Sequence, residues 1–185
     1  MEPSDTAIGT KLKWRFWICI SGAVIFYFWM KHYLAPLQSG EIVQYEMAKT
    51  RDTAASLVRL WTQDGKIDKV LKSIYIDYFF IVIYCLAIST ACRFMCTLTK
   101  NNILIKAGIF FSYFIFAAGL FDVIENIAML KSLQQAVTYS NVSLAYKMAI
   151  SKFSIILMTL FFIAVCFMFW LLSAVPRKET SWKRV

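Results

Sequence analysis

The residues best placed to carry chemistry are ionisable side chains inside long apolar stretches. Asp77 lies near the start of one stretch, Asp122 and Glu125 lie near the end of another, and Lys152 stands at the entry of a third. A charged side chain at the centre of a membrane-spanning helix costs roughly 2.5–3.5 kcal/mol on insertion scales. Each of these residues therefore needs a partner or a purpose.

The spacing of these polar residues places them on common helical faces. Asp122, Glu125 and Asn126 follow an i, i+3, i+4 pattern, and Asp77 and Tyr84 are seven residues apart. Both spacings bring side chains to one side of an α-helix. We predict an inward-facing cluster of three carboxylates, one amide and one phenol. Either Lys152 and an arginine of the outer loop pair with the carboxylates, or some of the carboxylates are protonated.

The chemistry of such a cluster has three open interpretations. Three carboxylates cannot all stay ionised in a low dielectric without compensating cations, so a structural charge network that fixes helix register is one. The second is a ligand or ion site. The third is catalysis with Asp77 and Glu125 as acid-base groups, a chemistry that also leaves a magnesium ion or another divalent cation open as a cofactor.

Other catalytic and metal motifs are missing from the sequence. The single histidine, His32, has no nucleophile at motif spacing, and there is no glycine-rich phosphate loop, HExxH or GxSxG. Cys92 and Cys96 share a helical face, but no histidine or second cysteine pair lies nearby, so we predict no zinc site. The five cysteines are interpreted as small apolar residues of the spans and their ends.

The elements that must position the cluster are membrane spans. The chain has 185 residues, of which 59% are hydrophobic, and its charges leave four long stretches nearly free. A membrane-spanning helix needs roughly 20 mostly apolar residues. We predict one all-α membrane domain over residues 1–185, a four-transmembrane-helix bundle with spans at about 16–34, 74–92, 107–130 and 153–174.

Basic residues near the span ends predict the orientation of the bundle. They precede the first span, separate the second from the third and fill the tail 175–185, and basic loops face the cytoplasm. We therefore expect a multi-pass protein of the cell inner membrane with both termini cytoplasmic. The first span is interpreted as an uncleaved anchor. The loop that follows this span, residues 35–73, and the polar cluster then lie at the outer side of the membrane.

The formal net charge of +9 has a simple explanation in this arrangement. The basic residues form short clusters at membrane edges instead of one groove-sized face, so anionic lipid headgroups at the cytoplasmic face are the expected partner and nucleic acid is not. A homo-oligomer or a membrane-protein partner stays open.

The outer loop has a pattern of its own. Apolar residues recur at helical spacing from Ile42 to Trp61, which predicts one amphipathic helix that ends at the Asp64-Gly65 break. A second helix is expected from about Ile67 into the second span. In the other outward loop, Asn141 or Ser143 is expected to cap the helix that continues into the fourth span.

Four segments also resemble a family. The sequences VQYEMAKTRDTAASLVRLW, IDYFFIVIYCLAIS, FAAGLFDVIENIAML and AYKMAISKFSII are similar to the "fELA-T", "LDylFi--Y", "D--EN" and "A--Kf" segments of a group of uncharacterised bacterial four-span membrane proteins. The resemblance covers roughly residues 41–160. It names no activity.

The resemblance implies a larger site, in which Glu46 and Thr50 belong to a helix that covers the cluster and Trp61 supplies an apolar plug. The residues that it singles out are Glu46, Thr50, Trp61, Asp77, Tyr84, Asp122, Glu125, Asn126 and Lys152.

Three functions follow as hypotheses. The first is a binding, accessory or assembly protein built on the buried cluster. The second is a membrane-embedded enzyme that acts on a lipid-like substrate and needs a pocket open sideways to the lipid. The third is an oligomeric channel or transporter, for which the other halves of the spans offer few polar residues.

Overall fold

The computed structural model describes residues 5–174 and is all-α over that range. Its helices are α1 (Asp5–Tyr33), α2 (Ser39–Glu46), α3 (Arg51–Gln63), α4 (Ile67–Leu98), α5 (Asn102–Gln134) and α6 (Tyr139–Ala174). The predicted all-α class is confirmed. The predicted cytoplasmic tail, residues 175–185, lies outside the described residues.

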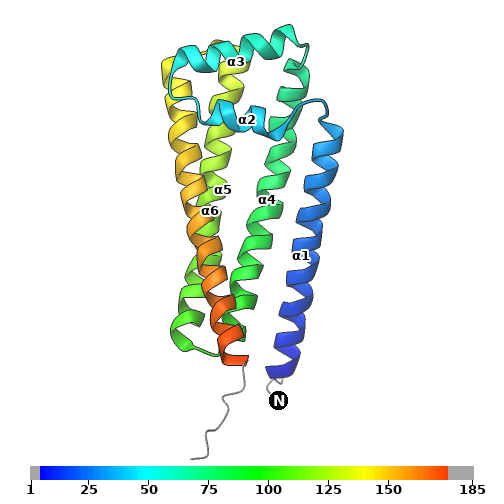
Figure 1. The fold of residues 1–185 in the computed structure, drawn as a ribbon, viewed down its shortest axis with the longest axis vertical. Helices are drawn as coiled ribbons and strands as arrows, with labels where there is room; N and C mark the ends of the chain where they lie inside the picture. Colours follow the sequence, from blue (N-terminus) through cyan, green and yellow to red (C-terminus); the bar gives the residue numbers. More distant parts are fainter. Residues whose placement is uncertain (1–4, 175–185) are drawn as a thin grey trace, which may run out of the picture.

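Four long helices run side by side, and two short ones lie across one end (Figure 1). α5 packs between α4 and α6, and α1 packs on the outer side of α4. The start of α1 and the end of α6 lie at the end of the bundle opposite α2 and α3 (Figure 1). The two ends of the bundle are named here the α2–α3 end and the α4–α5 turn end.

Within the described residues, three helices are long and apolar enough to cross a membrane: α4, α5 and α6. The prediction of four such spans is thus corrected to three. α1 is long enough, with 29 residues, but its tryptophans and tyrosines, and Lys31 and His32 in its last turn, make it less apolar. All three apolar helices extend beyond the predicted spans because polar turns continue them past the apolar core.

The loop predicted to face outward, residues 35–73, contains two helices before α4, where the sequence predicted one. α2 ends at Glu46, and Thr50 begins α3 by accepting a hydrogen bond from the Thr53 amide at 3.2 Å. A threonine that caps a helix start leaves the chain before it extended, so Glu46 and Thr50 belong to different helices. The predicted stop at Asp64-Gly65 is confirmed: Gly65 has φ +65°, a left-handed conformation that glycine adopts readily.

Helix α4 begins at Ile67, as predicted, and continues without a break into its apolar stretch. Helix α6 begins at Tyr139, before the predicted caps Asn141 and Ser143. The Thr138 hydroxyl accepts a hydrogen bond from the Asn141 amide at 3.2 Å, so threonine does the capping there.

The core forms three layers along the bundle. The layer at the α2–α3 end includes Tyr45, Trp61 and Met129, the middle layer is Ile115, Ala118 and Ile155, and the third layer lies at the α4–α5 turn end. Its buried members are Cys92, Met95, Cys96, Phe162 and Cys166. The buried polar cluster lies between the first and middle layers.

Candidate functional site

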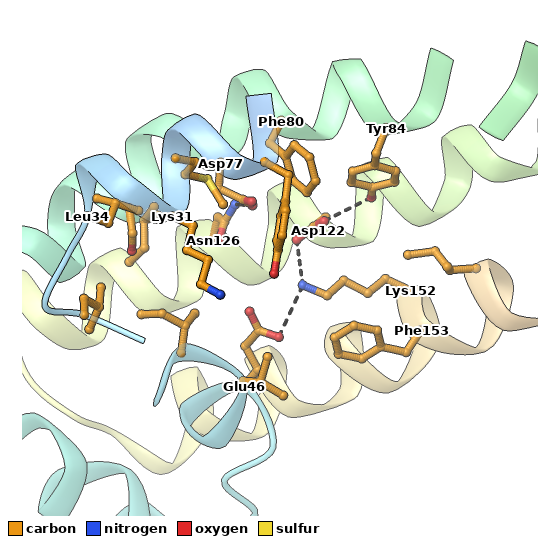
Figure 2. Close-up of a pocket in the computed structure, with 18 of the residues that line it drawn as sticks. Lys31, Leu34, Glu46, Asp77, Phe80, Tyr84, Asp122, Asn126, Lys152 and Phe153 are labelled. Atoms are coloured by element: carbon orange, nitrogen blue, oxygen red, sulfur yellow. Dashed lines mark hydrogen bonds and ion pairs between the residues drawn. The ribbon is translucent and has the colours of Figure 1, made fainter. Parts of the chain in front are cut away.

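The polar residues predicted from three separate spans converge on one place. Asp77 and Tyr84 come from α4, Asp122 and Asn126 from α5, and Lys152 from α6 (Figure 2). Glu46, at the end of α2, reaches the same place from above the bundle. Six of the nine predicted site residues are buried outright or nearly so; these are Glu46, Trp61, Asp122, Glu125, Asn126 and Lys152.

Lys152 is the centre of the cluster. Its ammonium lies 2.8 Å from Asp122 Oδ1, 2.9 Å from Glu125 Oε2 and 3.5 Å from Glu46 Oε2. The residue is only 6% exposed. A buried lysine requires such partners because an unpaired ammonium out of water is costly. Asp77 is not among its ion-pair partners.

Asp122 connects the lysine to the phenol. Its second oxygen, Oδ2, accepts a hydrogen bond from the Tyr84 hydroxyl at 3.0 Å. α4, α5 and α6 are therefore tied together through one carboxylate. The i, i+3, i+4 spacing achieves this by turning Asp122 and Glu125 to the same side of α5.

Asp77 has a separate partner. Its Oδ2 accepts a hydrogen bond from Asn126 Nδ2 at 2.7 Å, and it makes no ion pair with a residue that the structure describes. Its carboxylate also faces the cavity described below. Asp77 is thus the acidic group most available to a bound molecule.

Glu125 is set back from the residues that line the cavity. It is fully buried, it does not line the cavity, and neither of its oxygens accepts a hydrogen bond from a described group. It depends on the ion pair with Lys152. Of the two acid-base candidates, the structure therefore puts Asp77 within reach of a ligand and Glu125 out of reach.

Glu46 closes the cluster from the α2 side, and burial raises the pKa of its carboxyl group above the ordinary value of 4.5. The Lys152 ammonium opposes that rise, whereas the nearby Asp122 charge adds to it. Burial prevails because removal from water disfavours the ionised form.

A cavity of about 440 Å³ adjoins the cluster. Its polar residues are Lys31, Gln38, Glu46, Ser73, Asp77, Tyr84, Asp122, Asn126 and Lys152, and the rest of its wall is apolar. The apolar wall includes Tyr27, Met30, Leu34, Leu37, Ile42, Ile74, Phe80, Ile88, Phe153 and Ile156. Volumes of roughly 300–1,000 Å³ are typical of small-molecule pockets.

The cavity reaches from α1 to α6. Tyr27 and Met30 come from α1 and Phe153 and Ile156 from α6, whereas the main packing partner of α1 is α4. The cavity is partly open.

The cavity wall contributed by α1 was missed by sequence reasoning. Tyr27, Met30, Lys31 and Leu34 line the cavity and follow an i, i+3, i+4, i+7 pattern, the usual spacing of one helical face. That pattern was readable, but nothing in the sequence indicated that the face would border a cavity instead of a packed neighbour.

Besides Glu125, two residues singled out by the resemblance, Thr50 and Trp61, do not line the cavity. Thr50 is exposed and caps α3. Trp61 is 2% exposed and packs on the Tyr45 ring, and its Nε1 donates a hydrogen bond to Glu41 at 3.1 Å. Trp61 thus fixes α3 to α2, the helix that carries Glu46.

No group of three or more His, Cys, Asp or Glu side chains is arranged to hold a metal ion in the part of the chain that the structure describes. The Lys152 ammonium occupies the position between Asp122, Glu125 and Glu46 that a cation would otherwise take.

No protein-family model, curated protein or solved structure matches the chain. The resemblance to the bacterial four-span group stays a prediction.

Proposed function

We propose that this chain is an integral membrane protein that binds an amphiphilic molecule in the cavity beneath α2. The observation that carries the proposal is the make-up of the cavity, which has a polar side gathered from four helices and an apolar remainder. A molecule with a small polar head and an apolar body matches both surfaces. The binding function follows the first of the three sequence hypotheses.

The charged groups that line the cavity indicate which polar head group a bound molecule should have. Three carboxyl groups, those of Glu46, Asp77 and Asp122, line the cavity together with the ammonium groups of Lys31 and Lys152. Lys152 pairs with Glu46 and Asp122, and Asp77 makes no ion pair with a described residue. Acceptors are therefore in excess at the polar side of the cavity. A head that donates hydrogen bonds or carries a protonated amine would offset this excess, whereas an anionic head would add to it.

The position of the cavity, lined by both α1 and α6, suggests to us a lateral route by which the molecule would arrive. We propose that α1 lies in the membrane as the fourth span, since Ile18, Ile25 and Phe28 on it are 66%, 69% and 62% exposed. Large apolar side chains are seldom gathered on a face that meets water. A lipid-like molecule would then enter between α1 and α6 from the leaflet at the α2–α3 end.

The proposed orientation in a cell inner membrane keeps both termini in the cytoplasm. The described residues at the α4–α5 turn end include Lys11, Lys13, Arg93, Lys100 and Lys106, which favours the cytoplasmic side for that end. The cavity then opens toward the outer leaflet.

The binding proposal is tested by three probes of equal chain length: dodecylamine, dodecanol and dodecanoate. The readout is thermal unfolding of the detergent-purified protein, followed with a thiol-reactive dye, because Cys85, Cys92, Cys96 and Cys166 are buried. The amine should raise the melting temperature most and the carboxylate least. A ligand at a hundred times its dissociation constant stabilises by about 2.7 kcal/mol.

Matched variants separate cavity binding from detergent effects. Ile156→Trp fills the cavity and should abolish the shift, whereas Leu157→Trp on the neighbouring lipid-facing position, 69% exposed, should keep it. Asp77→Asn should weaken the amine's effect, and Asp68→Asn on the exposed side of α4 should not. Equal shifts with all three probes, or a full shift in I156W, would contradict the proposal.

A second candidate is acid-base catalysis on the bound head, favoured by the position of Asp77. Its carboxyl group faces the cavity and holds only the Asn126 hydrogen bond. Under this candidate, D77N would still bind the uncharged dodecanol as the wild type does but would lose turnover of the natural substrate. Under binding alone, D77N changes affinity and nothing else.

A further inference from the structure

A second cavity lies at the opposite end of the bundle and has the opposite charge. Its volume is about 480 Å³, and its wall contains Lys11 and Arg15 of α1 and Arg93 of α4. No carboxylate lines it among the residues that the structure describes. We name it the basic pocket. It stands apart from the carboxylate cavity, since Arg93 comes about 24 Å after Asp77 along α4.

Arg93 is held in place by its neighbours. Its Nε donates a hydrogen bond to the Ser112 hydroxyl at 3.1 Å, and its guanidinium carbon lies 5.0 Å from the centre of the Tyr113 ring. Ser112 is fully buried. One edge of the guanidinium is thus used inside the protein, and no ion pair with a described residue engages the other.

The wall below the three cations is apolar. Beside Cys96 and Thr97, the wall contains Leu12, Ile105, Ile109 and Tyr113, and Ile109 and Tyr113 are 48% and 64% exposed. Cations that lead onto an exposed apolar strip match a molecule with an anionic head and a hydrocarbon tail. Guanidinium groups suit phosphate in particular, because their planar donors bind its oxygens in pairs.

From this arrangement we propose that the basic pocket binds the phosphate group of an anionic phospholipid, with the acyl chain along Ile109 and Tyr113. The proposal requires only that the chain lies in a membrane and does not depend on the ligand of the carboxylate cavity. Such a lipid would bridge α1, α4 and α5, which all contribute to the wall of the pocket.

The test is native mass spectrometry of the detergent-purified, delipidated protein, titrated with phosphatidylglycerol or with phosphatidylcholine of the same acyl chains. The wild type should bind phosphatidylglycerol several-fold more tightly. Arg15→Gln should weaken that binding about fivefold, the effect expected of one basic residue at an anionic surface. Lys11→Gln should act in the same direction.

Lys13→Gln is the matched control, since Lys13 is exposed on the same helix between Lys11 and Arg15 but does not line the pocket. It should leave phosphatidylglycerol binding unchanged. Equal losses in K13Q and R15Q, or equal binding of the two lipids, would overturn the proposal in favour of diffuse surface charge. Complete displacement of phosphatidylglycerol by excess inorganic phosphate would overturn it in favour of a small-anion site.

Discussion

The Lys152 ammonium forms ion pairs with three carboxyl groups, which come from two other helices. Asp122 and Glu125 are on α5, and Glu46 comes from α2. In a low dielectric, the attraction of such a group is large, but so is the cost of removing each charge from water. The cluster therefore specifies how the helices fit together, and the loss of its one cation leaves several acids without compensation.

Replacement of Lys152 by methionine should destabilise the protein by about 3–5 kcal/mol, because it leaves buried carboxyl groups unpaired. The measurement is thermal or denaturant unfolding in detergent, followed with the thiol-reactive dye. Lys147→Met is the matched control on an exposed position of the same helix and should change stability by less than about 0.5 kcal/mol. Similar losses in both variants would show that the cluster contributes little.

Glu46 should make the stability of the protein depend on pH. Burial raises its folded-state pKa above the ordinary 4.5, so the fold favours the neutral carboxyl form. The contribution of Glu46 is then complete below pH 4.5 and is lost as the pH rises through the folded-state pKa. Glu46→Gln, which cannot ionise, should become more stable relative to wild type as the pH is raised from 4.5.

The measurement is the difference in melting temperature between E46Q and wild type across that pH range, which cancels the titration of groups common to both. Glu41→Gln is a suitable control, because Glu41 lies on α2 as well but pairs with Lys66 at the surface. A difference that stays constant with pH would mean that Glu46 keeps its charge in the fold.

At the scale of the elements, α4 and α5 approach closely through small residues. A Cβ atom on Gly119 would lie 2.7 Å from Cys85 Sγ and 3.2 Å from Ile81 Cγ2. The same contact brings Tyr84 of α4 within hydrogen-bond distance of Asp122 of α5. The glycine therefore serves the site as well as the packing.

Gly119→Ala should destabilise the protein by about 1–3 kcal/mol, the usual cost of excess volume in a packed core. Gly22→Ala on α1 adds the same methyl group where nothing lies within 4 Å and should leave stability unchanged or slightly higher. Adding Cys85→Ala to G119A should recover part of the loss, as measured by urea or heat unfolding without a thiol dye. No recovery would show that the helices separate for another reason.

The elements were largely predictable because their signals are local. Apolar stretches gave α4, α5 and α6, and the Asp64-Gly65 pair gave the end of α3. The division of the outer loop at Thr50 was missed, because helical spacing of apolar residues continues across it and the capping role of a threonine depends on the chain before it. The apolar content of α1 was overestimated for a different reason: its aromatic side chains are amphipathic.

At the scale of the whole molecule, the convergence of the cluster was predictable and the cavity beside it was not. Asp77, Asp122 and Lys152 were expected at one depth, because the chain reverses direction between α4, α5 and α6 and their positions along these helices match. The cavity depends on how far α1 stands from α6, and this distance is decided by packing between helices remote in sequence. A sequence pattern does not show which helix face will lack a packed neighbour.

The arrangement of α1 decides whether the molecule is a four-span bundle with a cavity open to lipid. Its exposed face is apolar, with Ile18, Ile25 and Phe28 all more than half exposed, and its two ends flank the bundle at opposite ends (Figure 1). If α1 crosses the membrane, residues before and after it must be reached from opposite sides. The α3 helix and the α4–α5 turn provide the reference sides.

Single cysteines at Lys13, Gln38, Thr62 and Asn101 should therefore label in two groups with a membrane-impermeant maleimide. Q38C and T62C should react in intact cells, and K13C and N101C should react only after the membrane is permeabilised. The unsubstituted parent is the control, since its native cysteines lie in helices along the bundle. Reaction of K13C together with Q38C from one side would place α1 on the membrane surface, and the lateral route into the cavity would then open to water instead of lipid.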